Sequence, residues 1–221
     1  MAFYLEEVKL NRLKKLLVYS LALFMLGMSI AFIQNTNLGM APWDALARNF
    51  YEGVPIDYKY LSPILSVFLI SFAYLIAWKK PNYKMIIPVL ISTLIGFSID
   101  LALLFIPNVS DLSIFLNYLY LFFAMILISV GLNVIIYCGY ILPALEQLIQ
   151  SLSLRLSISF GKAKLIGEAL AFILTIIFGL VFKHQNQWFF IGQTTIIILL
   201  FIGLSVDLFK KPVYFILGRI L

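Results

Sequence analysis

Long apolar stretches recur along this chain and constrain its fold more than any other feature. Six of them approach the roughly 20 residues that a helix needs to cross the hydrocarbon core of a bilayer. They cover residues 16–34, 60–78, 85–106, 114–137, 165–182 and 188–209. These stretches are too long for membrane β-strands and lack the polar alternation that a barrel interior requires. The sequence therefore predicts an all-α fold, a polytopic bundle of six transmembrane helices.

The composition excludes several classes of protein. Of the 221 residues, 63% are hydrophobic and 12% are charged, against about 45–50% and about 25% in soluble domains. A soluble fold of this size cannot bury such an excess. This excludes a soluble enzyme, a disordered chain and a nucleic-acid-binding domain, despite the net charge of +6. One cysteine, Cys138, and one histidine, His184, exclude a disulfide framework and a site of several cysteine or histidine ligands.

The sequence also lacks the usual signatures of an enzyme. It contains no zinc-protease motif, no nucleophile elbow, no phosphate-binding loop and no cysteine pair. With a single histidine, the commonest general base is nearly missing. We therefore expect no enzymatic activity, no cofactor and no metal site.

The basic residues predict the orientation of the chain. With the N-terminus in the cytoplasm, 13 of the 16 lysines and arginines fall on the inner side, and only Arg48, Lys59 and Lys183 fall outside. The positive-inside rule then places both termini in the cytoplasm. The head before the first span carries acidic as well as basic residues, so we expect a retained span rather than a cleaved signal peptide.

Two connections between spans, residues 38–56 and 140–159, are too long and too apolar for simple loops. Each contains a proline followed by an acid: Pro42 and Asp44, and Pro143 and Glu146. Proline suits the first turn of a helix, and an acid there interacts favourably with the positive end of the helix dipole. The pattern predicts a short interfacial or re-entrant helix in each connection.

The two halves of the sequence resemble each other. Residues 95–101 (IGFSIDL) and 202–208 (IGLSVDL) are identical at five of seven positions. Other corresponding pairs follow in the same order, namely Gly27 with Gly131 and Pro42 with Pro143. The shared order of span, proline helix, span and span predicts an internal repeat.

The repeats extend over about residues 12–107 and 113–211 of a single membrane domain, and an amphipathic tail covers 212–221. Each repeat holds three spans, so the second enters the membrane from the opposite side. Such inverted repeats underlie many alternating-access transporters.

The inverted arrangement also predicts where four acids lie. Asp100 is expected toward the outer end of its span, and Asp207 toward the inner end of the last span. Asp44 is expected at the outer face of the protein, and Glu146 at the inner face. The site would lie between the repeats, with Asp100 and Asp207 as its charged elements and with Asp44 and Glu146 near its two mouths.

One motif points to a family. Residues 38–44 (LGMAPWD) resemble the Leu-Gly-x-x-Pro-Trp-Asp motif of the YczE/YyaS/YitT-like bacterial membrane proteins, and residues 159–161 are similar too. The second half departs from the family, whose members often have Pro-x-Asp where this chain has Glu146 three residues after Pro143. The resemblance implies a multi-pass protein of the bacterial cytoplasmic membrane and no particular substrate.

Eight residues are candidate contacts for a solute or ion. A charged side chain at the middle of a membrane helix costs about 2.5–3.5 kcal/mol, so an acid within a span favours a functional role. The candidates are Asp100, Asp207, Asp44, Trp43, Glu146, Glu168, Asn133 and Gln193.

The acids also have structural alternatives. Asp100 lies inside its span, which predicts burial, whereas Asp207 can pair with lysines at the headgroups. Glu168 lies four residues after Lys164, and an ion pair with that lysine would satisfy it. For Glu146, a solvated interface is the alternative to a binding role.

The other candidates have alternatives of the same kind. Helix capping and membrane anchoring would explain Asp44 and Trp43. A hydrogen bond between helices would explain Asn133 and the corresponding Ser29. Gln193 could line a polar path or bind a neighbouring helix.

These features predict a membrane protein that binds or transports a small solute between two repeats. Two alternatives stay open: a substrate-binding membrane subunit of a larger importer, and a membrane partner or regulatory protein without transport. The predicted partners are the lipid bilayer, a small solute, and either a second copy of the chain or another membrane protein. Nucleic acid is not among them.

Overall fold

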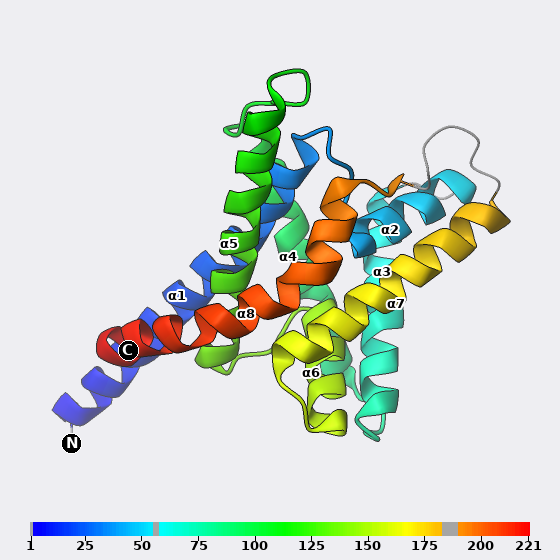
Figure 1. The fold of residues 1–221 in the computed structure, drawn as a ribbon. Coiled ribbons are helices and arrows are strands. Elements are labelled where there is room, and N and C mark those ends of the chain that lie inside the picture. The colour runs from blue at the N-terminus through cyan, green and yellow to red at the C-terminus, as the bar shows by residue number, and fades with distance from the viewer. Residues whose placement is uncertain (1, 55–57, 183–189) are drawn as a thin grey trace.

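The computed structural model describes residues 2–54, 58–182 and 190–221. Within these ranges the regular structure is helical throughout, without strands (Figure 1). The α-helices are α1 (Ala2–Gln34), α2 (Pro42–Gly53), α3 (Tyr58–Ile76), α4 (Ile86–Leu103), α5 (Ile114–Cys138), α6 (Ala144–Leu156), α7 (Phe160–Val181) and α8 (Gln193–Ile220), and a 3₁₀ turn, η1 (Tyr83–Met85), precedes α4.

Local sequence explains where several of these helices begin and end. Pro42 starts α2, where its missing N–H costs nothing. The hydroxyls of Ser113 and Ser159 accept hydrogen bonds from the first turns of α5 and α7. Gly139, with a φ of 66°, ends α5 in the left-handed conformation that glycine adopts without strain.

Four segments are long and apolar enough to cross a membrane: Arg12–Gln34, Tyr83–Leu103, Ile114–Cys138 and Phe160–Val181. They contain or largely overlap four of the six predicted spans, which supports a helical membrane protein. The predicted span at 60–78 corresponds to the shorter apolar helix Pro63–Ile76. The predicted span at 188–209 begins partly outside the described residues, and its helix, α8, starts at Gln193.

The segment predicted as an amphipathic tail, residues 212–221, belongs almost entirely to helix α8. Helix α8 continues through Pro212 to Ile220, and in Figure 1 it bends on its way to the C-terminus. Proline removes one backbone hydrogen bond and bends a helix. Here Val213 and Leu217, one turn apart, are buried in the core, so packing holds the helix together beyond the proline.

The helices pack in a recurring pattern. Helix α1 packs against α4 and α5, and α8 packs against α5 and α7. The short helix α2 lies on α7, and the short helix α6 lies on α3. The largest apolar core forms where α1, α5 and α8 meet, with Ala22, Leu132, Ile135 and Ile202 almost fully buried.

Large apolar side chains cover much of the outer surface of the bundle. Leu75, Phe97, Leu104, Phe105 and Leu208 are among those exposed by more than 60%. A soluble monomer rarely exposes so much contiguous apolar surface. The exterior therefore suits the hydrocarbon core of a bilayer.

Two glycines bring α7 and α8 into direct backbone contact. A Cβ atom on Gly203 would overlap the carbonyl oxygen of Gly161, and one on Gly161 would overlap that of Gly203. Such contacts between small residues are how helices approach closely in lipid. The corresponding glycine of the first half, Gly96, has open space around it.

We expect Gly203→Ala to destabilise the protein by about 1–3 kcal/mol, because the added methyl group must push α7 and α8 apart. Thermal unfolding in detergent measures this loss. Gly96→Ala is the matched control and should leave the melting temperature unchanged or raise it slightly, since alanine favours a helix. Equal effects of the two substitutions would contradict the close approach.

Candidate functional site

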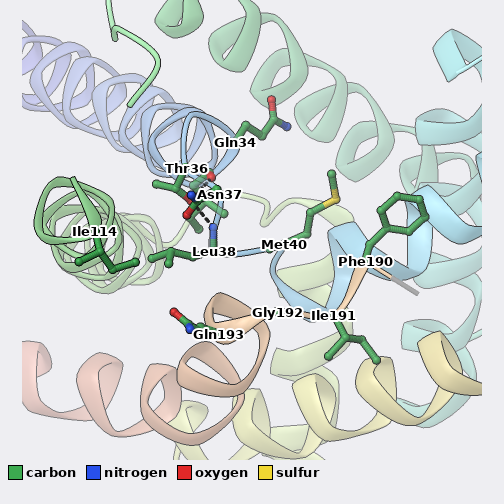
Figure 2. A pocket seen from close by; sticks show the side chains of 12 residues that line it. Gln34, Thr36, Asn37, Leu38, Met40, Ile114, Phe190, Ile191, Gly192 and Gln193 are labelled. Carbon is green, nitrogen blue, oxygen red and sulfur yellow. Dashed lines mark hydrogen bonds between the residues drawn. The ribbon is translucent and has the colours of Figure 1, made fainter. Parts of the chain in front are cut away.

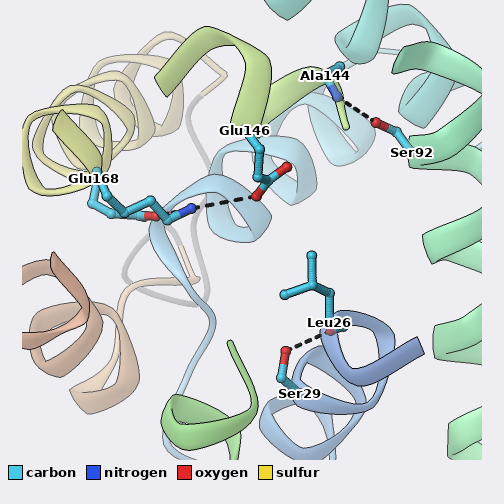
Figure 3. Close-up of polar contacts among 7 residues, drawn as sticks. Leu26, Ser29, Ser92, Ala144, Glu146 and Glu168 are labelled. Atoms are coloured by element: carbon cyan, nitrogen blue, oxygen red, sulfur yellow. Dashed lines mark hydrogen bonds and ion pairs between the residues drawn. The ribbon is translucent and has the colours of Figure 1, made fainter. Parts of the chain in front are cut away.

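A buried lysine lies at the centre of the candidate site. Lys164 is on the second turn of α7 and is 4% exposed. Its Nζ lies 3.1 Å from Oε1 of Glu168, one turn further along α7. It also lies 3.9 Å from Oε1 of Glu146, which comes from the first turn of α6. Figure 3 shows Glu146 and the α7 side chains pointing toward one another.

A third carboxylate acts on the same group. Asp44, in the first turn of α2, is half-buried. Desolvation raises its pKa to about 6, the charge of Glu168 adds to that rise, and Lys164 opposes it. We call Asp44, Glu146, Lys164 and Glu168 the Lys164 cluster. It joins three helices, α2, α6 and α7.

Two polar atoms, one on α7 and one in the first turn of α2, are buried without a hydrogen-bond partner among the described residues. One is Oε2 of Glu168, and the other is the indole Nε1 of Trp43. Trp43 packs against an apolar group formed by residues of α3, α4 and α6, Ala144 among them. The unpaired acceptor and the unpaired donor are what a bound polar molecule could satisfy.

Hydroxyl groups fix the beginnings of the two short helices. The hydroxyl of Thr175, on α7, donates to the carbonyl of Pro42 at 3.2 Å. The backbone N–H of Ala144 donates to the hydroxyl of Ser92, on α4, at 3.0 Å (Figure 3). Each short helix is therefore attached by its first residues to a long helix of the bundle.

The expected separation of Asp44 and Glu146 on opposite faces is wrong. Both act on the same lysine, and Glu146 is 8% exposed rather than solvated. The reason is that both short helices begin toward the interior. Lys164, counted among the cytoplasmic charges in the sequence, is also buried. The predicted ion pair between Lys164 and Glu168 is confirmed.

Asp100 and Asp207 lie away from the cluster. Asp100 is exposed, so its expected burial is wrong. Asp207 accepts hydrogen bonds from the hydroxyl of Ser159 at 2.5 Å and from the backbone N–H of Gly161 at 3.1 Å. It therefore caps the start of α7 from α8, a role that neither sequence interpretation included.

The remaining candidates make local contacts. Asn133 is buried and its Nδ2 donates to the carbonyl of Val206 at 2.7 Å, which confirms a hydrogen bond between helices α5 and α8. The expected bond between helices from Ser29 is wrong, because its hydroxyl donates within α1, to Leu26. Gln193 is exposed and accepts a hydrogen bond from the hydroxyl of Tyr118 at 2.6 Å.

A cavity of about 620 Å³ lies where the end of α1 meets the start of α8 (Figure 2). Its wall includes the extended segment after α1, residues 36–40, and residues 190–193. The backbone N–H of Thr194 donates to the carbonyl of Leu38 at 2.9 Å. Gly39, with a φ of 89°, leaves no room for a side chain against Gly192.

Sequence reasoning listed three of the four cluster residues but missed Lys164 as their centre. The signal available was a lysine within an apolar helix, followed by a glutamate four residues later. The serine and threonine anchors, Ser92 and Thr175, carry no such signal, because hydroxyls in membrane helices usually bond within their own helix.

The comparisons with known proteins give a family and no activity. Residues 13–211 match a family of unknown function, DUF6198. No curated protein and no solved structure matches the chain. The resemblance to the YczE/YyaS/YitT-like proteins therefore stays a prediction that rests on the LGMAPWD motif.

We expect Lys164→Met to destabilise the protein by about 3–5 kcal/mol, because it leaves Glu146 and Glu168 buried without a counter-charge. Thermal unfolding in detergent measures the loss. Adding Glu168→Met to this variant should recover part of it, since one unpaired charge is then removed. Wild-type stability of Lys164→Met would contradict the burial of the cluster.

The raised pKa of Asp44 predicts that the stability of the folded protein depends on pH. Its pKa of about 6 in the folded protein lies above its ordinary value of 3.8. The group therefore favours folding most below about pH 4, and this contribution is lost as the pH rises through about 6. Melting temperatures of wild type and Asp44→Asn, measured from pH 4 to 8, should diverge over this interval by several degrees in favour of the variant. Parallel profiles would refute the raised pKa, and Asp100→Asn serves as the control.

Proposed function

We propose that this chain, which belongs to the DUF6198 family of unknown function, binds a small solute within its helical bundle and moves it across a membrane. The observation that carries the proposal is the Lys164 cluster. Charged groups within membrane proteins are costly and mark solute, ion or proton pathways. This cluster gathers four ionisable residues from three helices.

The arrangement of the helices supports an inverted repeat. Exchanging α1, α2, α3 and α4 with α5, α6, α7 and α8 reproduces the pattern of contacts between helices. The pair α1–α4 corresponds to α5–α8, α2–α7 to α6–α3, and α3–α4 to α7–α8. Transporters built from such repeats bind their substrates where discontinuous helices of the two halves meet. The chain breaks between α1 and α2 and between α5 and α6 in this way.

We assign the entry of the solute to the cavity at the end of α1. It lies between the end of α1 in the first half and the starts of α5 and α8 in the second. The segment that lines it, residues 36–40, leads directly into α2 and so to Trp43 and Asp44. In the proposed mechanism the solute enters at this cavity and is bound beside the cluster. Movement of one repeat against the other then opens the opposite side.

The orientation is part of the proposal. The N-terminus of α1 and the C-terminus of α8 lie on the same side of the bundle in Figure 1. The excess of lysine and arginine predicted for that side favours a cytoplasmic location for both termini, and we propose the inner membrane of a bacterium as the site of the protein. We propose no catalytic step and no cofactor for this protein.

A thermal-unfolding screen of small solutes on the purified protein in detergent tests the proposal. A solute at about 100 times its Kd should stabilise the wild type by about 2.7 kcal/mol. The effect should disappear in Glu168→Gln and persist in Asp100→Asn, whose acid is exposed and away from the cluster. The stabilising solute should then exchange across proteoliposomes that contain the wild type.

Two results would overturn this proposal. One is the failure of every solute class to stabilise a wild type that unfolds cooperatively. The other is stabilisation that Glu168→Gln leaves unchanged, which would place binding away from the cluster. Binding without exchange in proteoliposomes would contradict transport and would support the alternative that the chain is a solute-binding subunit.

A further inference from the structure

We infer that the solute recognised at the Lys164 cluster carries a protonated amine. The inference rests on the proposed function and adds the chemical class of the substrate. It follows from three features: the net charge of the cluster, its excess of oxygen acceptors over hydrogen-bond donors, and the aromatic ring of Trp43, which precedes Asp44 in the chain.

The cluster holds more negative than positive charge. Asp44, Glu146 and Glu168 supply three carboxylates, and Lys164 supplies one ammonium. The helix starts at Asp44 and Glu146 add about half a positive charge each. The balance is therefore about one negative charge, which a singly charged cation would neutralise.

Oxygen acceptors outnumber hydrogen-bond donors in the cluster, because its three carboxylates have six oxygens. The ammonium of Lys164 has three N–H groups, and it reaches Oε1 of Glu168 at 3.1 Å. Its distance of 3.9 Å to Oε1 of Glu146 is longer than a hydrogen bond. Oε2 of Glu168 has no donor among the described residues, although Glu168 is only 3% exposed. A second ammonium group would supply the missing donors.

The geometry favours an amine over a metal ion or an anion. Among the residues that the structure describes, no three acidic, histidine or cysteine side chains are grouped closely enough to hold a metal ion. The carboxylates surround an ammonium, and a second one needs only one or two oxygen acceptors. An anion would meet the unpaired oxygen of Glu168 and be repelled.

Trp43 adds a third feature that suits an amine. It precedes Asp44 in the chain, and its side chain packs against an apolar group from α3, α4 and α6. Aromatic faces attract ammonium groups, by about 0.5–2 kcal/mol. Its unpaired indole N–H could in turn donate to an oxygen on the same solute.

Thermal unfolding at pH 7.5 and constant ionic strength tests the inference with four probes: methylammonium chloride, tetraethylammonium chloride, sodium acetate and acetamide. Methylammonium should raise the melting temperature in a saturable manner, by about 5–10 °C near saturation. Tetraethylammonium has the charge but no N–H group, and acetate and acetamide have the wrong charge, so these three should have no saturable effect.

Variants locate the effect. Glu168→Gln should abolish the response to methylammonium, and Asp100→Asn should retain it. Glu146→Gln serves as a second cluster variant in case Glu168→Gln unfolds. A response to methylammonium that survives in both cluster variants would overturn the inference.

The outcomes also separate this inference from the proposed function. If acetate or acetamide stabilises the wild type and Glu168→Gln abolishes the effect, the cluster binds solutes but the amine is wrong. If methylammonium fails while a solute without an ammonium group binds at the cluster, the inferred amine is again wrong. If no solute of any class binds, the proposed function is overturned as well.

Discussion

A lysine held among carboxylates, away from water and inside an apolar bundle, is the constraint to which the rest of the structure must conform. Transferring an ion from water into a protein interior costs several kcal/mol unless counter-charges lie close by. Lys164 and Glu168 satisfy part of this requirement within α7. The remainder has to come from elsewhere in the chain, so α2 and α6 must begin beside α7 with Asp44 and Glu146 in their first turns.

The breaks in the chain make this convergence possible. A continuous membrane helix would carry the chain past the interior without presenting a helix start there. Gly139 ends α5 in a left-handed conformation, and the extended segment around Gly39 separates α1 from α2. Backbone groups freed at such breaks must find partners within the protein. Ser92 provides one at the start of α6, where it accepts from the N–H of Ala144. At the start of α2 the hydroxyl of Thr175 adds a hydrogen bond to the carbonyl of Pro42.

The sequence predicts the elements of this fold better than their relations. Apolar length identifies the long helices, Pro42 identifies the start of α2, and the spacing of Lys164 and Glu168 identifies their ion pair. The direction of a short helix leaves no trace in its own periodicity, so Asp44 and Glu146 were expected on opposite faces. The cap that Asp207 forms on α7 likewise depends on the contact between α7 and α8, which no local pattern encodes.

The two halves of the proposed repeat can be compared to distinguish residues that the packing of the helices needs from residues that the site needs. Short helix α6 packs on α3 as α2 packs on α7, yet residues 63–76 of α3 contain no charged side chain. Apolar residues such as Ile70 and Ala73 fill the contact there. The same pairing of helices thus forms without buried ions. A charge that served packing alone would be replaceable in α7 as well, and for this reason the proposed function rests on the buried charges of Lys164 and Glu168.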